Sequence, residues 1–426
     1  MIKKEIKGLD VGVYYEKLDN GLQIYMIPFE NRNNYSIEYL TKYGSYTNSF
    51  KSNITGKKIK TPPGVAHFLE HKMFEQEDGI SPFNYYSQTG TEANASTGYR
   101  VTSYSVDGTT NIEENLEYLL NYVNSPHFTD KNVEKEKGII IEELNMYKDE
   151  PENRLYEESN KILFYKHPLR IDVGGTPKSV KKITKEILYE CYNTFYQPSN
   201  MVLLISGKFD PKKILKVVKS NKKLNSKESN KEITIYKENE PYNVRLKEKE
   251  IKIESMVIPK FIYTLKLRRP KLEGEEKYKF KVILEIFLYC LYGMSSEFRE
   301  EMLNKDMFSL FFTSGILLDD FMLIEFISET KYPKEFKKAI EKSLMTIKIT
   351  KKDVERVKKV KLSIEVVESD KPYQLLNASL SEILDYGDII YNKVDIIKSI
   401  TLEDVLKIRD YIDISNSSLM IGYPKE

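Results

Sequence analysis

The sequence predicts an α+β protein built from two homologous halves, each a mostly antiparallel sheet packed with helices. Three observations lead to this fold class. At 426 residues the chain is long enough for two domains with separate cores. Strand-like and helix-like segments mix without a strict β-α-β rhythm, which favours the α+β class. A long segment near the middle of the chain is also repeated near its end.

The repeated segment is the main indication of two similar halves. Its first copy, ITKEILYECYNTFYQPSNMVLLISG, begins at Ile183, and its second, ITLEDVLKIRDYIDISNSSLMIGYP, begins at Ile400. Each copy reads as Ile-Thr-x-Glu, an amphipathic helix with Thr at its N-cap, Ser-Asn and an alternating apolar strand. A match of this length indicates duplication. The alternative is a chance likeness between two helix-then-strand units.

A polar stretch separates the halves. Residues 226–245 are rich in Lys, Asn, Ser and Glu and poor in aliphatic residues, as is typical of an exposed linker. We therefore expect a first domain at residues 1–225 and a second at residues 246–426.

The first half can be divided further into expected elements. Asn20-Gly21 is typical of a tight hairpin turn between two strands. After it we expect a strand at SIEYLTKYG, a helix at GVAHFLEH, a strand at YRVTSYSVDG, and two helices at NIEENLEYLLNYVNS and DKNVEKEKGIIIEELNMYKDE.

Composition excludes several classes of function. The chain has 66 basic and 64 acidic side chains and no basic stripe interleaved with aromatic residues, so we expect no nucleic-acid partner. No window of eighteen apolar residues is present, and the N-terminus lacks the features of a signal peptide, so we expect no membrane association. Cys191 and Cys290 lie in apolar helical patterns and are expected to be buried free thiols. We expect a cytoplasmic protein.

Two of the four histidines lie in one short segment, His67-Phe68-Leu69-Glu70-His71. In a helix, residues i, i+3 and i+4 project from one face, so His67, Glu70 and His71 lie together. Two imidazoles one turn apart can bind one zinc ion, and the glutamate beside them can act as general base. The alternative is a pair of histidines without metal. His127 and His167 lie in loop-like contexts and are expected to be structural.

A catalytic zinc needs a third protein ligand. The segment VEKEKGIIIEELNMY offers Glu134, Glu136, Glu142 and Glu143. Glu136 and Glu143 are seven residues apart and share a helix face, whereas Glu142 points about a third of a turn away. Helical phase alone does not say which face is turned toward the histidines.

The combination of His-x-x-Glu-His with a later Glu-Glu-Leu-x-Met-Tyr segment resembles the pitrilysin family of zinc peptidases, the inverzincins. The resemblance extends through NYYSQTGTEANASTGYRVTSYSV, HPLRIDVGGTPKSVKKIT and ECYNTFYQPSNMVLLISGKFDP, and the length is similar to that of the half-size processing peptidases. It implies zinc as cofactor, with His67, His71 and Glu143 as ligands and Glu70 as general base. It also implies that Glu136 orients one of the ligands.

The resemblance further implies how a peptide substrate is bound. TEANASTGYRVTSYSV is similar to the family's edge strand, where the peptide adds as an extra strand. It implies that Asn94, Ala95, Ser96 and Thr97 face the substrate. The alternative for these four residues is a small polar turn that leads into a strand.

One part of the family pattern is missing. Relatives with a complete site carry an Arg and a Tyr in the second half that stabilise the oxyanion. In GMSSEFREEMLNKDMFSLFFTSG the Arg position holds Leu303, and the Tyr position falls near Phe308 or Ser309; Arg299 is expected to be a solvated charge. The resemblance therefore implies a heterodimer in which a second half-length chain supplies Arg and Tyr.

Two functions follow as hypotheses. The first is a zinc-dependent endopeptidase subunit that hydrolyses peptides held in extended form, active together with a partner subunit. The second is a peptide-binding or scaffold subunit without catalytic activity. Because the metal-site residues are all present, the sequence favours the enzyme; these are His67, Glu70, His71, Glu136 and Glu143.

Overall fold

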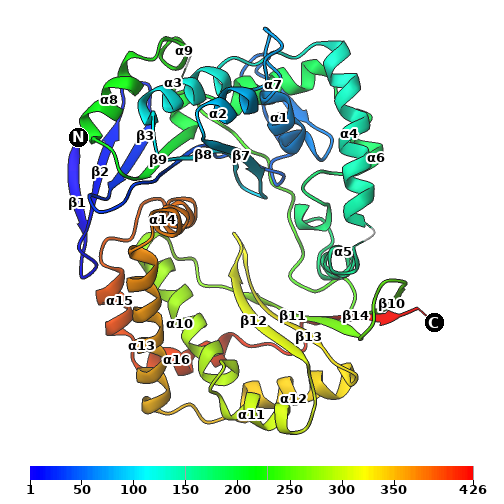
Figure 1. The fold of residues 1–426 in the computed structure, drawn as a ribbon. Coiled ribbons are helices and arrows are strands. Elements are labelled where there is room, and N and C mark those ends of the chain that lie inside the picture. The colour runs from blue at the N-terminus through cyan, green and yellow to red at the C-terminus, as the bar shows by residue number, and fades with distance from the viewer. Residues whose placement is uncertain (149, 228, 426) are drawn as a thin grey trace. The chain divides into compact units, whose positions relative to one another are not determined.

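The computed structural model describes residues 1–148, 150–227 and 229–425 (Figure 1). The chain forms two compact units that exchange segments. Unit 1 contains residues 1–145, 171–237 and 367–384, and unit 2 contains residues 146–170, 238–366 and 385–426. The change from one unit to the other at residues 237 and 238 falls inside the linker expected at 226–245. The exchanged segments 146–170 and 367–384 were not indicated by the sequence.

Unit 1 is built on a seven-stranded sheet in the order β1-β2-β3-β9-β4-β8-β7. All neighbouring strands are antiparallel except β3 and β9, which run parallel. The hairpin expected at Asn20-Gly21 joins β2 to β3, and Gly21 has a φ of 88°. The strands are β1 (Ile2–Ile6), β2 (Val11–Lys17), β3 (Gln23–Pro28), β4 (Tyr35–Thr41), β7 (Glu92–Thr97), β8 (Thr102–Gly108) and β9 (Met201–Gly207); a separate small sheet pairs β5 (Ser49–Lys51) with β6 (Lys58–Lys60).

Unit 2 repeats this topology in a shorter form. Its five-stranded sheet has the order β10-β14-β11-β13-β12, in which only β10 and β14 are parallel. This order matches β3-β9-β4-β8-β7 of unit 1, and the parallel pair occupies the same place. The predicted fold class of two homologous α+β halves is therefore confirmed. The strands are β10 (Glu248–Ile253), β11 (Lys260–Arg268), β12 (Leu310–Leu317), β13 (Phe321–Glu329) and β14 (Ser417–Pro424).

Helices cover the sheets. In unit 1, α1 packs on β7 and β8, and α3 packs on β4 and β8 (Figure 1). The main helices of the first half are α1 (Val65–Met73), α2 (Pro82–Gln88), α3 (Ile112–Val123), α4 (Asp130–Lys148), α5 (Pro151–Leu163), α7 (Lys185–Phe195) and α8 (Pro211–Ser220). Those of the second half are α10 (Gly274–Tyr292), α11 (Glu297–Asn304), α12 (Pro333–Thr346), α13 (Lys351–Ser369), α14 (Pro372–Tyr386), α15 (Lys393–Ser399) and α16 (Leu402–Leu406). No helix of the described residues is both long and apolar enough to span a bilayer.

The repeated segments adopt the predicted helix-then-strand form in both units. Thr184 caps α7 by accepting a hydrogen bond from the N–H of Ile187, and Thr401 caps α16 in a capping box with Asp404. The strands that follow are β9 and β14. They occupy equivalent places in the two sheets, each next to the strand with which it pairs in parallel, β3 or β10. Cys191 and Cys290 are free and buried, as expected.

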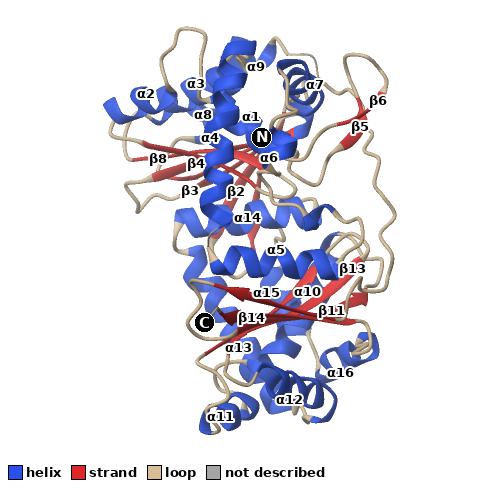
Figure 2. Ribbon diagram, turned by 90° about the vertical axis from the view of Figure 1, so that its right-hand side faces the viewer, coloured by secondary structure: helices blue, strands red, loops and turns tan. Residues whose placement is uncertain are grey.

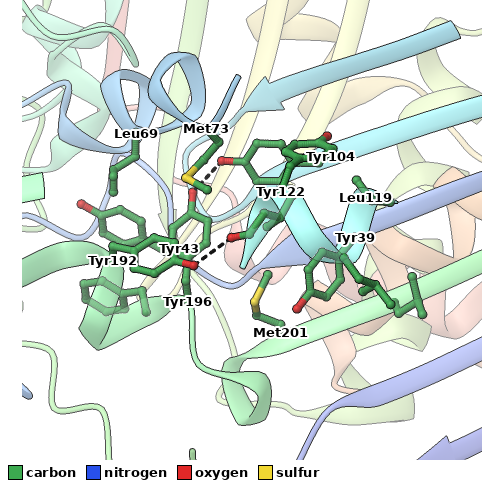
Figure 3. Packing of buried hydrophobic residues seen from close by; sticks show 14 of the residues in the cluster. Tyr39, Tyr43, Leu69, Met73, Tyr104, Leu119, Tyr122, Tyr192, Tyr196 and Met201 are labelled. Atoms are coloured by element: carbon green, nitrogen blue, oxygen red, sulfur yellow. Dashed lines mark hydrogen bonds between the residues drawn. The ribbon is translucent and has the colours of Figure 1, made fainter. Parts of the chain in front are cut away.

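The core of unit 1 is rich in tyrosine (Figure 3). The hydroxyl groups of Tyr104 and Tyr196 are 2.9 Å apart, and that of Tyr192 donates to the carbonyl of Val123 at 2.8 Å. These hydrogen bonds offset the cost of burying polar groups. Leu69 and Met73 of α1 are fully buried in the same cluster. Through them the core fixes how α1 is rotated about its axis.

Unit 2 receives α5 from the first half of the chain. This helix packs on β14 and β11 (Figure 2). Its Tyr156 donates to Glu325 of β13 at 3.4 Å, and Glu325 is only 5% exposed. Burial raises the pKa of Glu325 from 4.5 to about 7, although hydrogen bonds from Tyr156 and Ser314 oppose this shift. Folding therefore keeps the Glu325 carboxyl group protonated at pH values below about 7.

This shift predicts how stability depends on pH. Between pH 4.5 and about 7 the unfolded chain loses the Glu325 proton and the folded chain keeps it, so stability is lost as pH rises through this window. The loss from this group is at most about 3 kcal/mol. Glu325→Gln cannot ionise and should show a smaller drop in melting temperature between pH 5 and pH 8 than the unmodified protein. Glu297→Gln, at an exposed site of the same unit, is the control and should not change that drop. An unchanged drop in Glu325→Gln would contradict the assignment.

Candidate active site

The site begins with a tight approach of two glycine-containing loops. Gly64 precedes α1 with a φ of 95°, in the left-handed region that favours glycine. A Cβ at this position would lie 2.3 Å from the carbonyl oxygen of Gly174. A Cβ at Gly174 would lie 3.4 Å from Nδ1 of His67. The absence of side chains at both positions lets residues 174–175 pack behind the start of α1 and the His67 ring.

The structure brings His67, His71 and Glu143 together. Nε2 of His67 lies 3.8 Å from Oε1 of Glu143, and Nε2 of His71 lies 3.5 Å from Oε2 of Glu143. One ligand atom from each of the three residues lies within 4.8 Å of the others. The histidines come from α1 and the glutamate from α4, so the site depends on how these two helices meet.

This arrangement fits a zinc ion. Zinc binds His nitrogen and carboxylate oxygen at about 2.0–2.2 Å in tetrahedral geometry, which requires donor atoms separated by roughly 3–4 Å. Oε2 of Glu143 is buried and makes no hydrogen bond within the described part of the chain. Burial, and to a lesser extent the neighbouring His71, lowers the pKa of His67 to about 4, so this imidazole is neutral and can act as a ligand. The neutral imidazole of His67, the Nε2 of His71 and a carboxylate oxygen of Glu143 that makes no hydrogen bond are a donor set that a divalent cation would satisfy.

Glu136 lies directly behind His71. Its Oε1 is 3.0 Å from Nδ1 of His71. Burial opposes the charge on His71, but the hydrogen bond and the negative charges of the nearby glutamates outweigh it and raise the pKa of His71. Burial likewise opposes ionisation of Glu136, but the contact with His71 and the charge of Lys72 lower its pKa. The contact holds Nδ1 toward α4 and leaves Nε2 to face Glu143.

Glu70 lies on the same face of α1 as the two histidines, but its hydrogen-bond partner is on β7 and not on α4. Thr97 at the end of β7 donates to Oε2 of Glu70 at 2.5 Å. Burial raises the pKa of Glu70, and the Thr97 hydrogen bond opposes this shift. A carboxylate with a raised pKa is a stronger base, which suits proton transfer near neutral pH.

The four residues expected to face substrate lie on β7, at the edge of the sheet of unit 1. Asn94 and Ser96 are exposed, whereas Ala95 packs against the core and Thr97 contacts Glu70. The N–H of Ala95 donates to the side chain of Asn94 at 2.9 Å and so points away from β8. β7 therefore presents main-chain groups along the edge that ends beside Glu70.

The other candidate acids point away from the site. Glu142 is exposed, and exposed Glu134 pairs with Lys137 at 2.8 Å. Glu136 and Glu143 share the face of α4 that meets α1, as their helical phase allowed. His127 and His167 take part in loop structure: the carbonyl of His127 accepts from Asn132, and Nδ1 of His167 accepts from the N–H of Leu169.

The expectation for Arg299 is wrong. Its guanidinium donates to the carbonyl oxygen of Phe311 at 3.1 Å and lies 5.3 Å from the ring centre of Phe308, so it stabilises the local fold of unit 2 and is not simply solvated. Leu303 is 51% exposed, Phe308 is buried, and Ser309 donates to Glu329. Leu303 and Phe308 carry no side-chain donor for an oxyanion.

Sequence reasoning missed two contributors to the site. Gly174 packs against Leu144 of α4 and beside His67, since a Cβ there would lie 2.9 Å from Cδ2 of Leu144, and the Gly-Gly pair at 174–175 was a signal that could have indicated it. Lys72, immediately after His71, is fully buried and lies 4.0 Å from Glu136. Nothing in the local sequence distinguishes this lysine from a solvated one.

Comparison with known families matches most of the chain. Residues 59–176 match the model of insulinase, peptidase family M16, and residues 182–361 match the model described as the peptidase M16 inactive domain. The chain belongs to peptidase family M16. The resemblance to pitrilysin-type zinc peptidases is therefore confirmed.

Individual relatives agree with this assignment. YmfH of Bacillus subtilis strain 168, an uncharacterized zinc protease, is 37% identical, and the alignment covers 95% of each chain. An M16-like peptidase from Alicyclobacillus acidocaldarius has a TM-score of 0.92 at 28% identity, with 99% of this chain and 100% of that chain covered. Pitrilysin shares the fold, with a TM-score of 0.76 at 13% identity; the alignment covers 99% of this chain and 46% of the pitrilysin chain.

The geometry predicts different roles for two adjacent glutamates. Glu143→Gln should lose tightly bound zinc, because it removes one of the three expected ligands. Glu142→Gln should keep it, because that side chain is exposed. Metal content measured by mass spectrometry after dialysis separates the two variants. A zinc-free Glu142→Gln beside a zinc-loaded Glu143→Gln would overturn the ligand assignment.

Proposed function

We propose that this chain is a zinc-dependent endopeptidase subunit that hydrolyses peptides held in extended form. The observation that carries the proposal is the grouping of His67, His71 and Glu143, with Glu70 beside them and outside the ligand set. One base and three ligands on two helices are the parts that a hydrolytic zinc site needs.

Each side chain has a separate task in this reaction. His67, His71 and Glu143 would hold the metal, which when bound supplies Lewis-acid activation of water and of the scissile carbonyl. Glu70 accepts a proton from the attacking water and delivers it to the leaving amine. Thr97 holds the Glu70 carboxylate in place through its hydrogen bond.

The edge strand suggests how a peptide is oriented. We propose that an extended substrate pairs with the outer main-chain groups of β7, so that Asn94, Ala95, Ser96 and Thr97 line its path. Main-chain pairing provides affinity with little dependence on sequence, and side-chain pockets would add selectivity. Because β7 ends at Thr97, which contacts Glu70, a peptide along this edge would pass the general base.

We further propose that the active form is a heterodimer in the cytoplasm. The Arg and Tyr that stabilise the oxyanion in complete relatives have no counterpart at Leu303 and Phe308, so a second half-length chain of the same family would supply them. The free buried thiols of Cys191 and Cys290 are consistent with a reducing compartment.

A non-catalytic peptide-binding subunit is the second candidate. It is favoured by the missing Arg and Tyr and by the match of residues 182–361 to a domain described as inactive. The presence of Glu70 and its hydrogen bond from Thr97 favour the enzyme, because a scaffold has no need of a base.

The role of Glu70 can be tested apart from metal binding. Glu70→Gln should keep zinc and lose peptidase activity by on the order of a hundredfold or more, because the base is removed and the ligands remain. Chelation of the unmodified protein should abolish cleavage. Glu134→Gln, at an exposed site on α4, should leave both properties unchanged. Full activity of Glu70→Gln, measured by cleavage of an extended fluorogenic peptide with the partner present, would contradict the role.

The need for a partner is tested by assaying the chain alone and then with a similar half-length chain that carries Arg and Tyr. The lone chain should be slower by on the order of a hundredfold or more, as when an oxyanion donor is absent. The partner should restore cleavage, and the partner with its Arg or Tyr replaced should not. Robust cleavage by the purified lone chain would contradict the heterodimer.

A further inference from the structure

Lys72 is an unusual residue in α1, the helix that carries His67 and His71. It follows His71 directly in α1, and its side chain has 0% exposure. Lysine is almost never fully buried unless its charge is paired, because burial of an unpaired charge is costly. Its partners therefore indicate why it is retained there.

Two carboxylates face the Lys72 ammonium group. Glu75, three residues on and just beyond the end of α1 at Met73, is in direct contact with it. Glu136, from α4, places its Oε2 at 4.0 Å from Nζ. The other oxygen of Glu136 is the one that lies 3.0 Å from Nδ1 of His71. Glu136 is thus situated between a buried cation and a metal-binding imidazole.

Consecutive residues of α1 face the two oxygens of this carboxylate: Nδ1 of His71 is 3.0 Å from Oε1, and Nζ of Lys72 is 4.0 Å from Oε2. Residues i and i+1 are separated by about 100° around a helix, so His71 and Lys72 approach Glu136 from different directions. A carboxylate fixed at one oxygen can still rotate. With a cation near the second oxygen, the rotation that keeps Oε1 toward His71 is favoured electrostatically.

The surrounding negative charge explains why the Lys72 ammonium group is tolerated so near the proposed zinc site. Glu70, Glu136 and Glu143 are three acidic side chains grouped around two histidines. Lys72 offsets part of this negative charge. Because Lys72 is also paired with Glu75, the pair is close to neutral and repels a bound metal only weakly. The ammonium group still favours one orientation of Glu136, because it lies 4.0 Å from Oε2 of that carboxylate.

We propose that Lys72 is a positioning residue that holds Glu136 against His71 and thereby strengthens zinc binding. This inference rests on the proposed function, since it assigns zinc to His67, His71 and Glu143. Lys72 acts only through Glu136 and touches neither metal nor substrate.

A double-mutant cycle on zinc affinity tests this proposal. Zinc dissociation constants are measured by competition with a chromogenic chelator for the unmodified chain, Lys72→Met, Glu136→Gln and the double variant. Glu136→Gln should weaken binding roughly ten- to a hundredfold, as loss of a carboxylate behind a ligand does. Lys72→Met should weaken it by a smaller factor, roughly three- to tenfold. The double variant should bind zinc as Glu136→Gln does, because Lys72 has no effect without its carboxylate.

Controls separate this role from a general effect on folding. Lys266, in unit 2, is also a fully buried lysine paired with a glutamate, Glu240, at 2.8 Å. Lys266→Met should lower the melting temperature of the metal-free protein and leave zinc affinity unchanged. If Lys72→Met does not fold, Lys72→Gln takes its place in the cycle, since it removes the charge and keeps a polar atom.

The outcomes are distinct. Effects of Lys72→Met and Glu136→Gln that multiply in the double variant would overturn the proposal, because Lys72 would then act independently of Glu136. Unchanged or tighter zinc binding by Lys72→Met would also overturn it. If the unmodified chain binds no zinc, the proposed function fails and this inference fails with it. If zinc binds and only the cycle is multiplicative, the proposed function stands and this inference alone is wrong.

Discussion

The contact between α1 and α4 is the constraint on which the site depends. His67, Glu70 and His71 lie on one helix, and Glu136 and Glu143 lie on another that is separated from it by more than fifty residues of chain. A metal site requires donor atoms placed within a few tenths of an ångström, so small rotations of either helix would separate them. The buried side chains of α1, the glycines at positions 64 and 174, and the contact between His71 and Glu136 each restrict such rotation.

The core of unit 1 supports a site in which several charged or titratable side chains are buried close together. Several carboxylates lie close together near two imidazoles, and burial shifts the pKa of Glu70 upward and that of His67 downward. In the tyrosine cluster beneath α1, the hydroxyl groups of Tyr104 and Tyr196 bond to each other and that of Tyr192 bonds to a main-chain carbonyl. A core with directional hydrogen bonds specifies one packing more strictly than an aliphatic core of equal size.

The two units show how one topology can serve different purposes. The strand orders β3-β9-β4-β8-β7 and β10-β14-β11-β13-β12 are equivalent, yet the group found in the described residues that could hold a metal lies in unit 1. In unit 2, aromatic side chains including Phe311 pack in the core, and Arg299 donates to the carbonyl of Phe311. Duplication therefore supplied two scaffolds, and side-chain chemistry distinguishes them. The fold alone does not determine the activity of this family member, which depends on the side chains of the site.

The sequence by itself determined the features that depend on local periodicity. The spacing of His67, Glu70 and His71 placed them on one helix face, and the seven-residue interval paired Glu136 with Glu143. The repeat at Ile183 and Ile400 indicated two similar halves. These inferences succeeded because helical geometry relates neighbours in sequence to neighbours in space.

Only the tertiary structure decided which face of α4 meets α1 and that Lys72 is buried near Glu136. It also decided that Arg299 donates to a main-chain carbonyl. Finally, it assigned residues 146–170 to unit 2 and residues 367–384 to unit 1. Each of these depends on contacts between segments far apart in the chain. The free energy of such contacts comes from burial and charge pairing with partners that a local pattern does not identify.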